Sequence, residues 1–311
     1  MAKNKFYRFP LYLLVRFWAA VVCVLPRSWA LVLGRRIGRF GFYCVRRHRE
    51  KALLHLRMAF GHEKSEEEIR ELAQKVFEHM VQTAVDILQF PKLNQKKVAR
   101  MVDPGNAFKM YDEILGEGKG LISLTAHLGN WELLAGIFAL KGYKGAVLAR
   151  RIYYDRYDRW ILSLRKSIGI PLTIYRDESA KKILTLLRHN QIIGMLPDQD
   201  TDSLKGIFVP FFGRPAYTTE APVRIALATG APIVTNFLIR EKGDRYRVVV
   251  RDVIRPVVET TRQEAIQKYT EQWMYSFESM IRQYPEQWAW MHPRWKTQPE
   301  PEVKNLCRMA V

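Results

Sequence analysis

The chain has 311 residues, of which 48% are hydrophobic, so it can bury a substantial core in one large domain or two small ones. Its net charge of +19 indicates an acidic partner, such as nucleic acid, an anionic membrane or an acidic protein. Three scattered cysteines exclude a disulfide framework and a structural zinc site, and they favour a reducing compartment that faces the cytosol.

The N-terminal segment is both basic and apolar. Residues 1–51 contain twelve Lys or Arg and one acid, Glu50, and within them residues 9–26 read FPLYLLVRFWAAVVCVLP. This run is at the lower length limit for crossing a bilayer, and Arg16 interrupts it. No small-residue cleavage site follows, which argues against a signal peptide. We expect a retained helical anchor that spans the bilayer or lies in its interface, with a buried core helix as the alternative.

The rest of the chain reads as alternating helices and strands. Ser65 and Glu68 form a capping box that predicts a helix ending near Pro91. Apolar strand-like runs alternate with helical patterns near 130–140, 155–168, 178–189 and 218–229, and a last helix is expected near 262–283. The expected strands are GLISLTA, GAVLAR, LTIYR, QIIGMLP, GIFVPFF, PIVTNFLIR and YRVVVRDVI, the last two paired.

This alternation predicts an α/β fold with a mixed, mostly parallel sheet flanked by helices. The expected organisation is a basic membrane-anchor region at 1–60, an α/β domain at 61–300 and a tail at 301–311. No internal repeat, low-complexity tract or flexible linker interrupts the chain.

The segment LTAHLGNWELL places His127 and Glu132 at a change from strand to helix. Five residues turn by about 500° on one helix, so the two side chains converge only if His127 precedes the helix. Asn130 is a good N-cap, which would put Glu132 in the first helical turn. His127 then lies at the carboxyl end of a strand, where open α/β sheets place their sites.

In this geometry we expect Glu132 to accept a hydrogen bond from one imidazole nitrogen, while the other nitrogen takes a proton. A lone base of this kind suits direct attack by a substrate hydroxyl on an activated acyl group. The N–H groups that begin the following helix could stabilise an oxyanion. There is no G-x-S-x-G, H-E-x-x-H or C-x-x-C motif, so neither a serine acyl-enzyme nor zinc is indicated.

The HLGNWE segment resembles the H-x4-[D/E] motif of the glycerolipid acyltransferase superfamily. Three further blocks resemble the late acyltransferases of lipid A biosynthesis, and PDQD stands where the EGTR block of glycerol-phosphate acyltransferases would be. The blocks are GMLPDQD at 194–200, GIFVPFFGRPAYTTEAPVRIALATGAPIV at 206–234, and YPEQWAWMHPRWKT at 284–297. The resemblance runs from the N-terminal segment to about Thr297.

The resemblance implies a membrane-bound O-acyltransferase on the cytosolic side of the bacterial inner membrane. Such an enzyme moves a fatty acyl chain from acyl carrier protein to a hydroxyacyl hydroxyl on a Kdo-bearing lipid A precursor, without a cofactor. By position, His127 is the general base and Glu132 its partner. Arg165 and Asp198 match further functional residues of the family, and the aspartate is expected to orient Arg165 or another basic group at the lipid headgroup.

Each of these residues also has a structural interpretation. His127 could be a satisfied core histidine, Glu132 a helix N-terminal acid, and Arg165 one surface charge among several. Asp198 and Asp200, a further substrate-binding candidate, could be turn formers after Pro197. Arg150, beside Arg151 at a strand end, could bind a phosphate or carboxylate or simply be solvated. The tryptophans of QWAWMHPRWK suit a membrane interface or a packed C-terminal segment.

Two other functions compete with this interpretation. One is an acyltransferase of the same superfamily that uses acyl-CoA and acts on another phospholipid or glycolipid, such as a phosphatidylinositol mannoside. The other is a basic nucleic-acid-binding protein, but no recognised basic fold or aromatic platform is present, so no nucleic acid is expected. The sequence leaves open the acyl chain length, the hydroxyl that is acylated, the need for Kdo and the oligomeric state.

Overall fold

The computed structural model describes residues 7–299 except 171, 176–179 and 202. The predicted tail at 301–311 lies outside the described residues. The helices are α1 (Arg8–Val24), α2 (Arg27–Cys44), α3 (Arg46–Phe60), α4 (Glu66–Leu88), α5 (Gln95–Met101), α6 (Ala107–Leu115), α7 (Trp131–Lys141), α8 (Asp155–Ser167), α9 (Ala180–Arg188), α10 (Ala221–Thr229) and α11 (Arg262–Gln283). The strands are β1 (Val102–Asp103), β2 (Leu121–Leu124), β3 (Gly145–Ala149), β4 (Thr173–Tyr175), β5 (Ile192–Met195), β6 (Gly206–Phe211), β7 (Arg214–Thr219), β8 (Ile233–Arg240) and β9 (Tyr246–Ile254).

A seven-stranded sheet forms the centre of the molecule, in the order β1-β9-β8-β2-β5-β3-β4. All neighbouring pairs are parallel except β8 and β9, which are antiparallel. The predicted mixed, mostly parallel sheet is therefore confirmed. The predicted strand GIFVPFF forms instead a separate antiparallel hairpin, β6 with β7.

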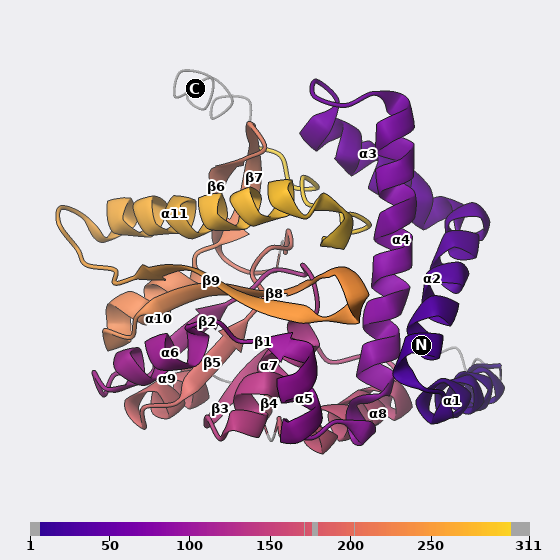
Figure 1. Cartoon of the computed structure of the whole chain (residues 1–311). Coiled ribbons are helices and arrows are strands. Elements are labelled where there is room, and N and C mark those ends of the chain that lie inside the picture. Colours follow the sequence, from indigo (N-terminus) through magenta and orange to yellow (C-terminus); the bar gives the residue numbers. More distant parts are fainter. Residues whose placement is uncertain (1–6, 171, 176–179, 202, 300–311) are drawn as a thin grey trace.

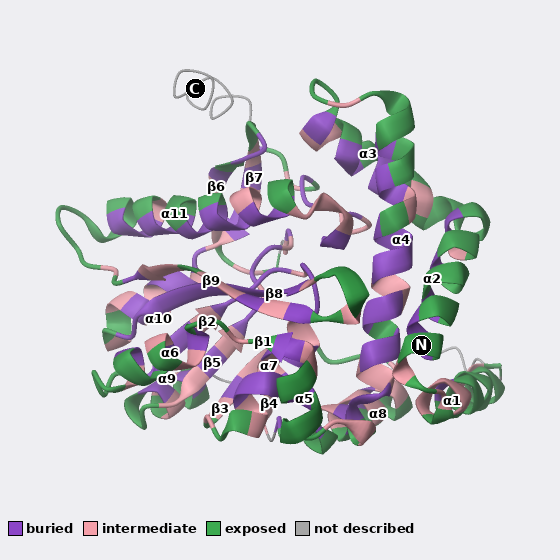
Figure 2. Ribbon diagram, viewed as in Figure 1, coloured by how far each residue is buried: buried purple, intermediate pink, exposed green. Residues whose placement is uncertain are grey.

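Helices cover both faces of this sheet, which is why its central strands are mostly apolar (Figures 1 and 2). One core lies between the sheet and α9, α10 and α11, and it extends to α3 and α4. The other core lies between the sheet and α5, α6, α7 and α8. Buried tryptophans of the C-terminal segment, Trp288, Trp290 and Trp295, belong to the first core, so this segment is packed inside the protein.

The N-terminal helices α1 and α2 lie beside α4, on the side away from the sheet (Figure 1). Helix α2 packs closely on α4 because Gly38 faces its backbone: a Cβ at Gly38 would lie 2.5 Å from the Cα of Glu78. Among the described residues, no helix combines the length and apolar character that crossing a bilayer requires. Helix α4 begins at the predicted capping box, in which Ser65 and Glu68 each accept the other's backbone N–H.

Candidate active site

The predicted strand-to-helix change at His127 is present. β2 ends at Leu124, and α7 begins at Trp131 with Asn130 as its N-cap, whose Oδ1 accepts the Leu133 N–H at 3.0 Å. Glu132 lies in the first turn of α7. Gly129, between His127 and Glu132, adopts φ +65°. A Cβ at this position would lie 2.0 Å from the Leu238 carbonyl oxygen. Only glycine fits this turn, so the chain path between base and acid is tightly defined.

The imidazole of His127 pairs with Asp198. Its Nδ1 lies 2.7 Å from Asp198 Oδ1, and its backbone N–H donates to Asp198 Oδ2 at 2.8 Å. The predicted hydrogen bond from the imidazole to Glu132 is therefore wrong. Sheet register explains the pairing: Leu124 of β2 lies opposite Met195 of β5, and His127 and Asp198 each follow three residues later. Both strands are parallel, so equal offsets bring both side chains to the same edge.

Glu132 pairs instead with Arg165 of α8. The guanidinium donates twice to the carboxylate, from Nε to Oε2 at 2.9 Å and from Nη2 to Oε1 at 2.5 Å. Both side chains are largely buried, with 14% of Arg165 and 15% of Glu132 exposed. Of the two partners expected for Asp198, Arg165 or another basic group, Arg165 is wrong, because Glu132 pairs with the arginine while Asp198 pairs with His127. A bidentate fork of this kind fixes both side chains in one geometry.

Charge and burial act in opposite directions on His127. Desolvation lowers the pKa of the imidazole, but the charge of Asp198 and its hydrogen bond, with the charge of Glu132, outweigh it and raise the pKa above its ordinary value. The pKa of the Asp198 carboxyl is lowered: burial acts to raise it, and the charge of His127 and hydrogen bonds from His127 and Trp288 prevail. Asp198 is therefore ionised, and His127 presents Nδ1–H to it.

The other nitrogen of His127 remains an acceptor in the neutral ring, because Nδ1 carries the hydrogen that Asp198 receives. Nε2 lies 3.4 Å from the side-chain nitrogen of Gln199, and 23% of the His127 side chain is exposed. The arrangement can therefore accept a proton at Nε2 while Asp198 stabilises the imidazolium that results. This is the geometry of a general base with a carboxylate partner.

An apolar cavity of about 80 Å³ lies beside this base, between α7 and the neighbouring strands β2, β3 and β5. Trp131 lines it and also contacts His127, with ring centroids 5.0 Å apart. Further lining comes mainly from apolar side chains, among them Leu134, Phe138, Val147, Ile170 and Met195. Its apolar lining suits a short part of a hydrocarbon chain, with Trp131 as the residue that connects the cavity to the imidazole.

The remaining predicted site residues lie apart from this centre. Asp200 is buried and accepts from the backbone N–H and hydroxyl of Thr297, at 2.6 and 2.8 Å, so it fastens the C-terminal segment. Arg150 is exposed just after the end of β3. Neither residue pairs with His127, Glu132 or Arg165 in the described contacts, and their predicted role in substrate binding stays a prediction.

Trp288 contacts the site, although the residue pattern indicated a membrane interface or a packed C-terminal segment for it and no contact with the site. Its Nε1–H donates to Asp198 Oδ2 at 2.9 Å. The residue types alone are compatible with this contact, because a buried indole N–H needs a hydrogen-bond acceptor and a buried carboxylate needs donors. The sequence could not pair these two residues, because 89 residues separate Asp198 from Trp288 and no local pattern relates them.

The chain is similar to known acyltransferases. The chain matches the family described as bacterial lipid A biosynthesis acyltransferase over residues 2–297. It is 24% identical to the lipid A biosynthesis lauroyltransferase of Escherichia coli K12 over 284 residues, 90% of this chain and 89% of that one. It is 23% identical to a phosphatidylinositol mannoside acyltransferase of Mycobacterium tuberculosis over 216 residues, 68% of this chain.

The mycobacterial alignment covers 66% of that relative, slightly less than two thirds of its length. The family match, in contrast, extends over almost all of the chain and includes His127, Glu132, Arg165 and Asp198. The chain therefore belongs to the bacterial lipid A biosynthesis acyltransferase family.

Proposed function

We propose that this enzyme transfers a fatty acyl chain from acyl carrier protein to a hydroxyl of a hydroxyacyl chain on a Kdo-bearing lipid A precursor. The observation that carries the proposal is the His127–Asp198 pair beside an apolar cavity, in a chain that matches the lipid A acyltransferase family almost throughout. The Escherichia coli lauroyltransferase, which aligns along 90% of the chain, supports this acceptor.

In the proposed reaction His127 Nε2 removes the proton of the acceptor hydroxyl as its oxygen attacks the thioester carbonyl. The tetrahedral intermediate collapses to the new ester, and the carrier thiolate leaves with the proton from Nε2. Asp198 keeps the imidazole in the required tautomer and balances its charge during both transfers. The backbone N–H groups of Trp131 and Glu132, in the first turn of α7, are candidates to stabilise the oxyanion.

We expect the acyl chain of the donor and the headgroup of the acceptor to bind at different parts of the site. The cavity beside Trp131 would take the donor's acyl chain, with the thioester near His127. Glu132 acts on the base through its charge and holds Arg165. Arg165 and Arg150 would contact phosphate or carboxylate of the headgroup. No cofactor is required by this chemistry.

The location proposed for the enzyme is the cytosolic face of the bacterial inner membrane. The outward faces of α1 and α2 expose large apolar and aromatic side chains, including Trp18, Trp29 and Phe40, next to many arginines. An amphipathic, basic surface of this kind binds in the interface of an anionic bilayer. The same positive charge suits an acidic carrier protein.

A second acceptor has specific support. The phosphatidylinositol mannoside acyltransferases of two mycobacterial species align with 58–68% of this chain. An enzyme of that type, using acyl-CoA, would employ the same base with a different headgroup. The acceptor, and not the base, would then distinguish the two functions.

The test is acyl transfer by the purified protein in detergent. A tetra-acylated Kdo-bearing lipid A precursor and a phosphatidylinositol mannoside are offered separately, each with lauroyl or myristoyl thioesters of acyl carrier protein and of CoA. Mass spectrometry should show one acyl chain added to the lipid A precursor from the carrier-protein donor. His127→Ala should abolish the product, whereas His62→Ala, at an exposed histidine before α4, should not. Product only from the mannoside would establish the second function instead.

A further inference from the structure

Three tryptophans of the C-terminal segment are equally buried but use their indole N–H groups differently. Trp288, Trp290 and Trp295 are 2%, 0% and 5% exposed. Trp288 donates to Asp198 at 2.9 Å, and Trp290 donates to the backbone oxygen of Pro285 at 2.7 Å. The indole nitrogen of Trp295 has no hydrogen-bond partner among the described residues. Only one of these three indoles therefore reaches the pair of His127 and Asp198.

The backbone around Trp288 is fastened to the loop that carries His127. Trp288 forms an antiparallel bridge with Leu128, the Ala289 N–H donates to the His127 carbonyl at 3.0 Å, and the Gly129 N–H donates to the Gln287 carbonyl at 3.0 Å. The indole is thus placed by the same turn that places the imidazole. Its contact with Asp198 does not depend on a flexible surface segment.

Asp198 receives three donors in a defined arrangement. Oδ1 accepts from the imidazole Nδ1, while Oδ2 accepts from the His127 backbone N–H and from Trp288. Two donors on Oδ2 prevent the carboxylate from rotating about its Cβ–Cγ bond, so Oδ1 stays directed at the imidazole. They also spread the negative charge, which makes the carboxylate a weaker base.

We propose that Trp288 is a positioning residue for the acyl transfer: its indole N–H orients Asp198 and limits how strongly that carboxylate holds the imidazolium of His127. The inference rests on the proposed function for its catalytic meaning, but the hydrogen-bond relation within the pair can be measured without substrate.

Removing this N–H has a predictable sign. A carboxylate with one donor fewer is a stronger base, so it stabilises the imidazolium more and raises the pKa of His127. The imidazolium then returns its proton to the leaving thiolate less readily, and the carboxylate is less well aligned. The kcat should fall while KM stays unchanged, because Trp288 donates to Asp198 and is not among the residues that line the proposed donor cavity.

The experiment compares Trp288→Phe with Trp290→Phe and Trp295→Phe. These matched controls remove an equally buried indole without removing a donor to Asp198. The His127 imidazole is titrated by NMR in the intact protein without substrate, and its signals are assigned by their loss in His127→Asn. Trp288→Phe alone should raise the His127 pKa, by about half a unit to one unit. With substrates it should lower kcat about tenfold at unchanged KM.

Several outcomes would overturn the inference. It fails if Trp288→Phe titrates like the wild type, or if the two control variants shift the His127 pKa by the same amount. If Trp288→Phe does not fold, benzothienylalanine is incorporated at position 288, which replaces the indole N–H by sulfur at nearly unchanged shape. The same NMR titration of His127 then tests whether loss of the N–H raises its pKa. A shifted pKa in a protein that acylates none of the offered acceptors would refute the proposed function and leave the role of Trp288 toward Asp198 in place.

Discussion

His127 owes its chemical character to a partner that lies far away in the chain. Asp198 supplies the negative charge and two hydrogen-bond acceptors, and its effect on the imidazole outweighs the desolvation that would otherwise keep the ring neutral. The base is neutral and active only above its pKa. Its activity should therefore depend on pH in a direction that Asp198 determines.

For the wild type we expect kcat/KM to rise with pH through a midpoint above 6.5, the ordinary value for an imidazole, because the pKa of His127 is raised. In Asp198→Asn the charge is lost and desolvation remains, so the midpoint should move down. The rate should also fall by about 10²–10⁴-fold, because the imidazolium loses its counter-charge. The measurement is the pH profile of acyl transfer.

The control for this profile is Asp200→Asn, the same substitution two residues further on. Asp200 is also buried, but it holds Thr297 and not His127. Its profile should keep the wild-type midpoint. Equal shifts in both variants would mean that the midpoint reports general electrostatics and not the pairing of His127 with Asp198.

The Glu132–Arg165 pair should behave as a coupled unit in stability measurements. Substituting either Glu132 or Arg165 by glutamine leaves the other charge largely buried and without this partner. Each single substitution should lower the free energy of unfolding by up to about 3–5 kcal/mol. The double variant Glu132→Gln with Arg165→Gln should recover part of this loss. Chemical denaturation of the two single variants and the double variant measures the coupling.

The control for this double-mutant cycle is the same set of substitutions in the exposed pair Glu241–Arg247, whose side chains are 42% and 40% exposed. Its coupling should be close to zero, because solvent screens both charges. Coupling of equal size in the two cycles would contradict the claim that burial strengthens the interaction between Glu132 and Arg165.

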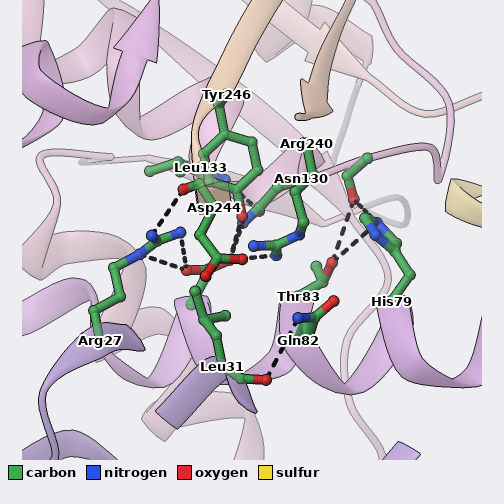
Figure 3. Close-up of polar contacts among 12 residues, drawn as sticks. Arg27, Leu31, His79, Gln82, Thr83, Asn130, Leu133, Arg240, Asp244 and Tyr246 are labelled. Carbon is green, nitrogen blue, oxygen red and sulfur yellow. Dashed lines mark hydrogen bonds and ion pairs between the residues drawn. The ribbon is translucent and has the colours of Figure 1, made fainter. Parts of the chain in front are cut away.

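At the scale of elements, helix α4 supports the turn between β2 and α7. The side chains of His79 and Thr83 contact the Gly129 carbonyl oxygen, and Asp86 accepts from Asn130 at 3.3 Å. Figure 3 shows this polar cluster, in which Arg27 of α2, Arg240 of β8 and Tyr246 of β9 also converge. One buried carboxylate, Asp86, therefore joins α2, the sheet and the start of α7.

Asn130 makes this support testable. Asn130→Ala removes the N-cap of α7 and should cost about 1 kcal/mol of the free energy of unfolding. It should also lower acyl transfer by tenfold or more, because it loosens the turn between His127 and Glu132. Urea unfolding and kcat are measured on the same preparation.

A second asparagine cap provides the matched control. Asn94 caps α5 through the Lys97 N–H, away from His127. Asn94→Ala should cost about 1 kcal/mol for the cap alone, without the further bond that Asn130 donates to Asp86, and it should leave kcat unchanged. If Asn94→Ala loses activity as Asn130→Ala does, the loss follows from reduced stability and not from the position of the turn.

On the scale of the whole molecule, exposed apolar surface is concentrated at one end. Of the twenty-two large hydrophobic side chains that are exposed among the described residues, sixteen lie between residues 7 and 45. These belong mainly to α1 and α2, whose outer sides are exposed in Figure 2. Soluble monomers seldom expose continuous apolar patches of this extent, so the surface marks an interaction site.

Binding to anionic vesicles tests the proposed membrane surface. Trp29→Glu combined with Phe40→Glu, at side chains 72% and 69% exposed, should weaken sedimentation with the vesicles at least tenfold. Tyr275→Glu, at a 73% exposed aromatic on α11, serves as the control and should bind like the wild type. Equal losses in both variants would indicate nonspecific charge repulsion from the lipid.

Local patterns predicted most of the helices and strands of this protein. The alternation of apolar runs predicted β2, β3, β4, β5, β8 and β9, and capping residues predicted the starts of α4 and α7. These signals are local, because hydrogen bonds of caps and the periodicity of apolar residues involve near neighbours in the chain. His127, Glu132, Arg165 and Asp198 were chosen with the help of a family resemblance, and they lie around one turn.

The partners within the site were decided only by tertiary structure. In sequence Glu132 is the acid nearest to His127, but the helix directs it to Arg165, while parallel pairing of β2 with β5 brings Asp198 to the imidazole. Two other strands, β3 and β4, lie between β2 and β5 in the chain, and no local pattern states that the outer two are neighbours in the sheet. Side-chain pairing depends on strand order, and strand order follows from how the whole chain buries its apolar surface on both faces of the sheet.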